Sequence, residues 1–245
     1  MALAKKRWDS IAHPLHSLGL LEDAIVTIAG AQGSHQVELN KRCVTPFCAD
    51  NGVVAQGVTQ SGQDVTTIVT KNFCIGEASV CVMARVAGAD VIPVDIGVAQ
   101  DVTEPGLRVH KIAYGTADIT QGPAMTREQA ADAILYGMNL VKELKEEGYR
   151  LIATGEMGIG NTTTSSALLS VLLHRPVEEM TGRGAGLSSE GLKRKIDAIH
   201  RAIEVNQPDP DDPLDTLHKV GGLDIAGLVG VFLGGAHHHL PIVID

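Results

Sequence analysis

Short apolar runs alternate along the chain with longer segments in which apolar residues recur every three or four positions. Four of the short runs, at residues 43–49, 91–95, 151–154 and 242–244, are rich in small or β-branched residues. Runs of this length that are bounded by turn residues are typical of buried β-strands. The sequence therefore predicts four strands in the interior of the protein.

The longer segments predict helices between these strands. Residues 64–86 have a helical spacing of apolar residues that stops at Gly88, and residues 223–236 are apolar on all sides, which indicates a buried helix. Thr126 and Gln129 have the spacing of a capping box at the start of a further helix. Strands that alternate with long helices imply an α/β fold, namely a Rossmann-like, mostly parallel sheet with helices on both faces.

The composition narrows the classes of function. The chain has 245 residues and a formal charge of −9, and only 3% of its residues are aromatic. An acidic protein repels phosphate backbones and anionic lipids, and so few aromatic side chains cannot provide a surface on which bases stack. No stretch reaches the ~20 apolar residues of a membrane span, the first residues lack the apolar core of a signal peptide, and the cysteines form no C-x-x-C pair. We expect a cytoplasmic protein that binds neither nucleic acid nor membrane.

Each of the four apolar runs ends in an acid or just before one: Asp50, Asp95, Glu156 and Asp245. The carboxyl ends of parallel strands meet at one edge of a sheet, where open α/β folds bind ligands. An acid in such a turn can also cap a helix or accept hydrogen bonds from loop amides. For any single one of these residues, a structural role is therefore an alternative to a role in a site. Four acids at one crevice favour a site for a cationic ring, ribose hydroxyls or a divalent metal ion.

The segment from Gly155 to Thr164 leads from a predicted strand into a helix whose start falls within residues 162–164. Its glycines let the backbone approach a ligand, and a helix start presents unpaired amides with a partial positive charge. The segment therefore predicts a site for a phosphate or another anion, although turns of this composition without a ligand are also common. It lacks the Gly-Lys-Ser/Thr of a Walker loop and the G-x-G-x-x-G spacing of NAD-binding folds, so a dehydrogenase would rest on fold analogy alone.

Two further clusters have a functional and a structural interpretation. The three histidines at residues 237–239 look like metal ligands, but successive side chains point in different directions, and we expect no metal site there. Residues 193–195 form a run of basic side chains on a predicted helix. Such runs are usually solvated, but one of these side chains could reach a phosphate.

With these motifs in view, the chain resembles the nicotinate-nucleotide:dimethylbenzimidazole phosphoribosyltransferase family of cobamide (vitamin B12) biosynthesis. The resemblance runs from HPLHSLGLLE near the start to IVID at the end, and its strongest blocks are FCADNGVVAQGV, GPAMTREQA and TGEMGIGNTTTSSAL. It implies an enzyme that moves the phosphoribosyl group of nicotinate mononucleotide onto 5,6-dimethylbenzimidazole or a related base. The products would be an α-ribazole 5′-phosphate and nicotinate. The resemblance also implies a homodimer that uses no cofactor and no metal ion.

The same resemblance assigns roles to individual residues. Glu156 would be the active-site acid, and Lys195 would meet the phosphate. The other residues that it places in the substrate site are Asp50, Gln63, Met157, Gly158, Gly160, Asn161, Thr162, Gly184 and Asp245. Residues 1–30, with a helix around 15–29, would be the amino-terminal part of a small helical domain, and residues 31–245 would be the α/β phosphoribosyltransferase domain.

Two departures from the family pattern bear on these expectations. The base-pocket loop reads Thr59-Gln60-Ser61-Gly62-Gln63 and lacks the family's Tyr-Pro step, which leaves the accepted base open. The family also continues beyond Asp245, through a portion that completes the small domain and carries the glutamate usually taken as the general base. We therefore expect a chain truncated at its carboxy-terminal end with an incomplete small subdomain. The alternative to an active enzyme is a nucleotide-binding fragment or half-enzyme that is inactive without that segment.

Overall fold

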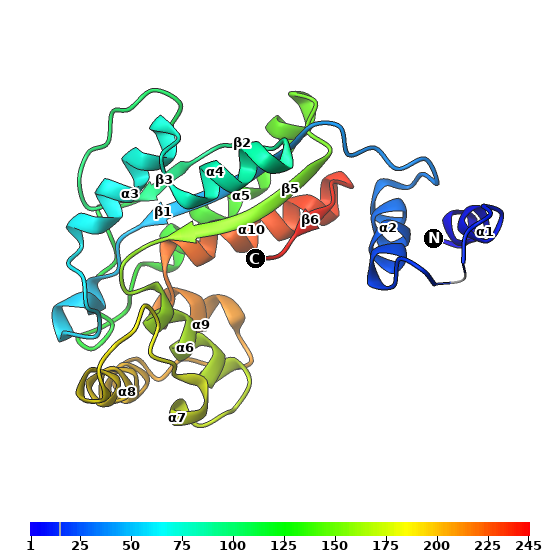
Figure 1. Ribbon diagram of the computed structural model, residues 1–245. Coiled ribbons are helices and arrows are strands. Elements are labelled where there is room, and N and C mark those ends of the chain that lie inside the picture. The colour runs from blue at the N-terminus through cyan, green and yellow to red at the C-terminus, as the bar shows by residue number, and fades with distance from the viewer. Residues whose placement is uncertain (15) are drawn as a thin grey trace.

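A parallel β-sheet runs through the computed structural model, which describes residues 1–14 and 16–245 (Figure 1). The strands are β1 (Arg42–Ala49), β2 (Asp90–Val91), β3 (Val94–Gly97), β4 (Arg108–Val109), β5 (Leu151–Met157) and β6 (Ile242–Val243). Their order is β4-β3-β1-β5-β6, β2 also pairs with β1, and every pairing is parallel. The predicted parallel sheet is confirmed.

The strand predicted at residues 91–95 is divided into β2 and β3. The two strands keep one register along β1, and this register places Pro93 opposite Pro46. The amide of Ile92 donates to the carbonyl of Val44 at 2.9 Å, and the next bond of this parallel ladder would have to come from Pro46. Because Pro46 has no N–H group to donate, the ladder of hydrogen bonds is interrupted at that point while the chain stays extended.

The single helix predicted over residues 64–86 is wrong, because the segment forms two helices. These are α3 (Asp64–Ile75) and α4 (Ser79–Ala87). Gly76 ends α3 with a φ of 78°, in the left-handed region that favours glycine. The helical spacing of apolar residues continues across this break, which is why the pattern alone did not reveal it.

Helices cover both faces of the sheet, as predicted. In Figure 1, α3 and α4 lie in front of the strands, and α5 (Arg127–Glu146) and α10 (Leu223–His238) lie behind them. The capping box at the start of α5 is confirmed: the amide of Gln129 donates to Thr126 Oγ1 at 3.1 Å, and the amide of Thr126 donates to Gln129 Oε1 at 2.9 Å.

The glycines of the apolar helix α10 allow it to pack closely on two sides. A Cβ on Gly227 would lie 2.3 Å from Phe47 Cδ1 of β1. A Cβ on Gly230 would lie 2.1 Å from the carbonyl oxygen of Ile134 and 2.9 Å from Gly137 Cα, both in α5. Helix α10 therefore touches the sheet on one side and the backbone of α5 on another, which explains why it is both apolar all round and rich in glycine.

Gly230→Ala should destabilise the protein by ~1–3 kcal/mol, because the added methyl group would force α5 and α10 apart. Urea unfolding of the variant and the parent measures the difference. Gly122→Ala is the matched control, since a Cβ on Gly122 would meet no atom within 4 Å and its backbone is not left-handed. Equal losses of stability in the two variants would contradict the close contact between the helices.

A second group of helices lies beyond the carboxyl end of β5, at the bottom of Figure 1. It consists of α6 (Asn161–Leu172), α7 (Val177–Met180), α8 (Ser189–Asn206) and α9 (Pro213–Val220), and α8 also contacts the short 3-10 helix η1 (Gly52–Gln56). The chain thus places a helical cluster directly beside the edge of the sheet at which the predicted site residues meet.

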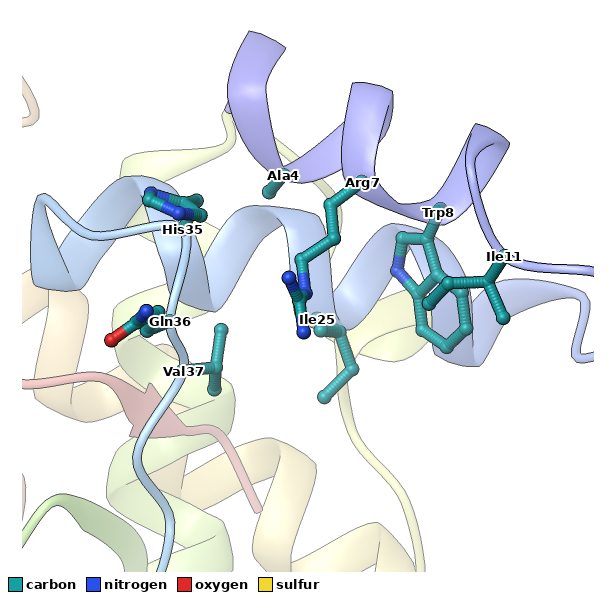
Figure 2. A pocket seen from close by; sticks show the side chains of 8 residues that line it. All are labelled: Ala4, Arg7, Trp8, Ile11, Ile25, His35, Gln36 and Val37. Atoms are coloured by element: carbon teal, nitrogen blue, oxygen red, sulfur yellow. The ribbon is translucent and has the colours of Figure 1, made fainter.

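The amino-terminal helices α1 (Ala2–Asp9) and α2 (Leu20–Gln32) contact each other and lie apart from the sheet (Figure 1). The helix expected around residues 15–29 is observed as α2, and Leu15 lies outside the described residues. A cavity of about 400 Å³ lies between these helices and the segment that follows them. Figure 2 shows the side chains that line it, which are Ala4, Arg7, Trp8, Ile11, Ile25, His35, Gln36 and Val37. Apolar side chains such as Leu20, which is 85% exposed, remain uncovered on this hairpin.

Candidate functional site

The ends of β1 and β5 bring the two strongest sequence motifs together. Phe47 lies opposite Glu156 and Cys48 lies opposite Met157 in the register of the two strands. The chain leaves β1 at Asp50 and leaves β5 at Gly158, so both turns lie at the same edge of the sheet. This edge is where an open α/β fold binds its ligand.

Asp50 is fully buried at this edge. Its Oδ2 accepts from the amide of Ala99 at 2.8 Å, whereas its Oδ1 has no hydrogen-bond partner. Burial raises the pKa of the Asp50 carboxyl above its ordinary value, and the Ala99 amide, the Thr66 side chain and the charge of Lys111 act in the opposite direction. Asp50 therefore holds the loop after β3 to the edge of the sheet.

The turn from Gly158 to Gly160 requires its glycines. A Cβ on Gly158 would lie 2.1 Å from the carbonyl oxygen of Ala49, and Gly160 has a φ of 98°. Between them, the amide of Ile159 donates to Thr66 Oγ1 of α3 at 3.0 Å. A larger residue at either glycine would push the turn away from the end of β1.

The expectation that this helix start presents unpaired amides is corrected. The amide of Asn161 donates to the carbonyl of Gly158 at 3.0 Å, and that of Thr163 donates to the carbonyl of Gly160 at 2.8 Å. The amide of Thr162 donates to Asn161 Oδ1 at 2.7 Å. The first turn of α6 thus satisfies these donors itself, and a bound anion needs a different source of positive charge.

Lys195 provides that charge. Although it lies on α8, it is only 1% exposed, and its Nζ donates to Thr162 Oγ1 at 2.7 Å and to the carbonyl of Gly182 at 3.2 Å. No carboxylate in the described part of the chain forms an ion pair with it. Burial lowers the pKa of Lys195 to about 8, which leaves the ammonium mostly protonated at neutral pH.

A small cavity opens beside this lysine. It has a volume of about 90 Å³ and is formed by residues 58–61, 159–162, 183–185 and 187. Gly184, with a φ of 55°, borders it, and a Cβ there would lie 2.8 Å from Thr162 Oγ1 and 3.5 Å from Lys195 Nζ. The absence of a side chain at this glycine keeps the approach to the ammonium group open.

Glu156 lies at the other side of the turn and is exposed. Asn161 Nδ2 donates to its carboxylate. Desolvation by the surrounding protein raises the pKa of Glu156, the hydrogen bond from Asn161 lowers it, and the negative charge of Asp245 raises it again. The carboxylate is held in place by Asn161 while one side of it faces solvent, as a group that contacts a ligand requires.

The remaining predicted residues lie around this turn with different degrees of exposure. Met157 is half-buried at the end of β5, and Asp245 is exposed, with its amide donating to Thr154 Oγ1 at 3.2 Å. Gln63 is half-buried, and its Nε2 donates to the carbonyl of Asn51 at 3.2 Å. Gln63 therefore supports the turn after β1 in this conformation.

Asp95, which was expected to border the crevice with the other three strand-end acids, has a structural role instead. It is fully buried, its Oδ1 accepts from the amide of Val98 at 2.9 Å, and its Oδ2 lies 2.9 Å from Lys111 Nζ. The structural reading of a strand-end acid is therefore correct for Asp95, because the ion pair and the amide already use its two oxygens.

Two further polar residues, Asn51 and Asp224, lie beneath the turn and were not predicted from the sequence. Both are fully buried, and each has a side-chain oxygen without a hydrogen-bond partner. One signal in the sequence could have identified Asp224. It is an acid in the first turn of an otherwise apolar helix, and that helix begins directly after Gly221 and Gly222. A charge at such a position calls for a specific neighbour, but its identity depends on the tertiary structure.

The described residues contain no group of three or more His, Cys, Asp or Glu side chains arranged to hold a metal ion. His237 and His238 lie in the last turn of α10, with their rings 4.7 Å apart at 78° to each other. Among the described helices, none combines the length and the apolar character that crossing a membrane requires.

Comparison with known proteins gives consistent matches along the whole chain. A protein-family model described as phosphoribosyltransferase matches residues 1–245. The chain is 49% identical to the nicotinate-nucleotide–dimethylbenzimidazole phosphoribosyltransferase of Acetivibrio thermocellus over 245 residues, which are all of this chain and 70% of that protein. It is 48% identical to the enzyme of the same name from Ruminiclostridium cellulolyticum, again over all of this chain and 70% of the relative.

A solved structure is also similar. The crystal structure of CobT from Thermus thermophilus matches with a TM-score of 0.93 and 39% identity, covering 100% of this chain and 73% of that one. The chain thus spans about 70% of the length of the relatives that it matches.

Proposed function

The chain belongs to the phosphoribosyltransferase family whose model matches residues 1–245, and on that premise we propose that it acts on nicotinate mononucleotide. The reaction transfers the phosphoribosyl group to 5,6-dimethylbenzimidazole or a related lower-ligand base and releases nicotinate. The α-ribazole 5′-phosphate that forms serves the assembly of the nucleotide loop of cobalamin. The names of the relatives, which are 49% and 48% identical, support this assignment.

The observation that carries the proposal is the buried, unpaired ammonium of Lys195 beside an open cavity. Removing a charge from water is costly unless an opposite charge meets it, and the described part of the chain offers no carboxylate partner. The 5′-phosphate of a nucleotide would supply that charge and would accept a charge-assisted hydrogen bond. Thr162, Gly184 and Asn161 would then border the phosphate and ribose.

The chemistry requires an acid near the ribose. The bond between C1′ and the pyridinium nitrogen breaks, the electron pair leaves with nicotinate, and positive charge accumulates on the ribose. A carboxylate held at that position stabilises the charge. Glu156 is proposed for this role, because Asn161 orients it at the open side of the turn. The imidazole nitrogen of the base attacks C1′ from the face opposite to the departing nicotinate, which inverts the configuration from β to α. The partner N–H of the base gives its proton to a carboxylate that acts as general base.

The other residues of the proposed substrate site surround these two groups. Gly158 and Gly160 shape the turn, Met157 would line the base pocket, and Gln63 lies in the loop that approaches the base. Asp50 and Asp245 add negative charge at the same edge of the sheet. Two observations support this arrangement: Asp50 lies directly after β1, and Asp245 is exposed with its amide donating to Thr154 of β5.

Three wider features belong to the same proposal. We infer a homodimer, supported by the uncovered apolar side chains of α1 and α2. We infer residence in the cytoplasm, supported by cysteines 43, 48, 74 and 81, which are all free thiols. We also infer that residues 1–30 form the amino-terminal part of a small helical domain beside the α/β domain of residues 31–245, because α1 and α2 contact each other.

Incubation of the chain with nicotinate mononucleotide and 5,6-dimethylbenzimidazole should release nicotinate and α-ribazole 5′-phosphate in equal amounts, as measured by liquid chromatography. A reaction without the base is the control and should release almost no nicotinate. A purine and a phenol in place of the benzimidazole would establish which bases are accepted. Saturable nucleotide binding in calorimetry without any release would favour the nucleotide-binding fragment, and the absence of both would contradict the proposal.

A further inference from the structure

Asp224 is a buried carboxyl for which the proposed reaction has no role. It lies in the first turn of α10 and is 0% exposed. Its Oδ1 accepts from the amide of Ile225 at 2.9 Å, whereas its Oδ2 has no hydrogen-bond partner. No basic side chain among the described residues forms an ion pair with it. An ionised carboxylate in this position would be costly.

Asn51 faces this carboxyl from the turn after β1. The two side chains come close to each other beside two glycines. Asp224 Oδ1 and Asn51 Oδ1 lie 2.2 and 2.9 Å from the place that a Cβ on Gly222 would take. Asp224 Oδ2 and Asn51 Nδ2 lie 3.2 and 3.0 Å from the place of a Cβ on Gly158. The two glycines therefore make room for a carboxyl and a carboxamide to lie side by side.

The pair of Asn51 and an ionised Asp224 has fewer hydrogen-bond donors than its buried acceptor oxygens require. Asn51 Oδ1 and Asp224 Oδ2 are both buried acceptors without a partner, and Asn51 Nδ2 makes only a long contact of 3.5 Å with the carbonyl of Ile159. A proton on Asp224 supplies the missing donor. The acid can then donate to Asn51 Oδ1 while it accepts from Asn51 Nδ2, as a carboxylic acid and an amide do in a paired dimer.

The surroundings favour the protonated form. Burial raises the pKa of Asp224 to about 7, and the negative charge of Glu156 on β5 acts in the same direction, while the amide of Ile225 and the Asn51 side chain lower it. The other titratable groups near it are the Cys48 thiol of β1 and, further along the same edge, Asp50, Asp95 and Lys111. Lys111 is paired with Asp95, so it does not neutralise this carboxyl.

We propose that Asp224 is a positioning residue, which as a neutral acid paired with Asn51 holds the turn at Gly158 in the shape that accepts the nucleotide. The effect reaches the turn through Asn51, whose Nδ2 lies next to the carbonyl of Ile159 and whose own carbonyl accepts from Gln63. When Asp224 ionises, the pair loses its proton and a second negative charge arises beneath Glu156. Both changes weaken the binding of a phosphorylated substrate.

The test, which rests on the proposed function, compares Asp224→Asn with Asp224→Leu. Asparagine is a neutral isostere that can pair with the Asn51 carboxamide, so at pH 6 it should restore nicotinate release at least tenfold over the leucine variant. The ratio of kcat/KM between Asp224→Asn and the parent should rise severalfold as the pH increases through about 7, since only the parent can ionise there. Taking the ratio cancels the titration of Lys195 and of the substrate phosphate. Asp197→Asn, an exposed residue on α8, is the control for the removal of one charge and should give a constant ratio.

Two outcomes of this comparison would overturn the proposal. A tenfold or greater loss in Asp224→Asn at pH 6 would mean that the negative charge itself is needed, and a ratio that stays constant with pH would mean that Asp224 only fills space. Thermal melts identify a variant that fails to fold. In that case, an NMR titration of the parent protein tests the proposal without any variant.

A ligand-free measurement separates this proposal from the proposed function. In NMR spectra of the parent, the carboxyl carbon of Asp224 should titrate near pH 7, and the amide of Ile159 should shift with it. In Asp224→Asn, the Ile159 amide should stay at its low-pH position throughout. Titration of the carboxyl below about pH 5, in the ordinary range of aspartate, would overturn the proposal even if the enzyme is active. Titration of the carboxyl near pH 7 would support the proposal even if the parent releases no nicotinate.

Discussion

Glu156→Gln should lower the rate of nicotinate release roughly 10²- to 10³-fold, because it removes the negative charge proposed to stabilise the developing charge on the ribose. Glutamine keeps the shape of the side chain and an oxygen that can accept from Asn161. The free energy of unfolding should therefore change little, since the side chain is exposed. Steady-state release of nicotinate and urea unfolding measure the two effects separately.

Glu204→Gln is the matched control for this variant. Glu204 is an exposed carboxylate on α8, so the control removes the same charge outside the site and should keep the parental rate. The pH dependence adds a second check: the pKa of Glu156 is raised, so the rate of the parent should fall as the pH drops through that value. A Glu156→Gln rate equal to that of the parent would remove Glu156 from the mechanism.

Lys195→Met should weaken the binding of nicotinate mononucleotide by ~1–3 kcal/mol, or about 5- to 150-fold, because a charged hydrogen bond to the phosphate is lost. Methionine retains most of the aliphatic length, so the packing of α8 is preserved. Calorimetric titration with the nucleotide measures the affinity. Lys193→Met, at an exposed position of the same helix, is the control and should bind as the parent does. Unchanged affinity in Lys195→Met would return Lys195 to a purely structural role.

The same variant should be more stable than the parent at neutral pH. Burial lowers the pKa of Lys195 from 10.5 to about 8, so between these values the unfolded chain binds a proton that the folded protein has released. Stability of the parent therefore rises as the pH increases from about 8 to 10.5, and below pH 8 the full cost of burying the ammonium remains.

Methionine removes that cost, which amounts to ~3 kcal/mol, while the lost hydrogen bonds to Thr162 and Gly182 offset part of the gain. We expect a net stabilisation of ~1–2 kcal/mol at pH 7 that declines as the pH increases through 8 to 10.5. Thermal unfolding across this range measures the difference. A variant that is less stable than the parent at pH 7 would indicate that Lys195 is held by favourable contacts instead of being strained by burial.

Much of the fold could be predicted because it depends on local pattern. The apolar run at residues 43–49 became β1, the capping box at Thr126 began α5, and the apolar segment from Leu223 became the buried helix α10. The errors arose where one residue interrupts a continuing pattern. Gly76 divides α3 from α4, and the missing N–H of Pro46 on the neighbouring strand separates β2 from β3, although the apolar spacing runs on across both breaks.

The site could be predicted only in part, since its parts are distant in sequence. The turn around Gly158 was evident from its own composition, and the strand-end acids were found from the rule for parallel sheets. Asp95 showed the limit of that rule, because Lys111 turns it into a structural ion pair. The unpaired amides expected at the start of α6 are satisfied within the turn, and the positive charge comes from Lys195 on α8 instead.

The order of apolar and polar residues by itself determined the class of fold, the starts of α5 and α10 and the edge of the sheet at which a ligand is expected, because these follow from hydrogen bonding and burial among neighbouring residues. Only the tertiary structure decided which charged groups are left without a partner. Lys195 lies in a helix that looks solvated in the sequence, and Asp224 lies in one that looks apolar. The burial of Lys195 follows from the packing of α8 against α6, α7, α9 and η1, and that of Asp224 follows from the packing of α10 against β1 and β5. The free energy of a buried charge depends on what surrounds it in three dimensions, and spacing along the chain carries no information about those surroundings.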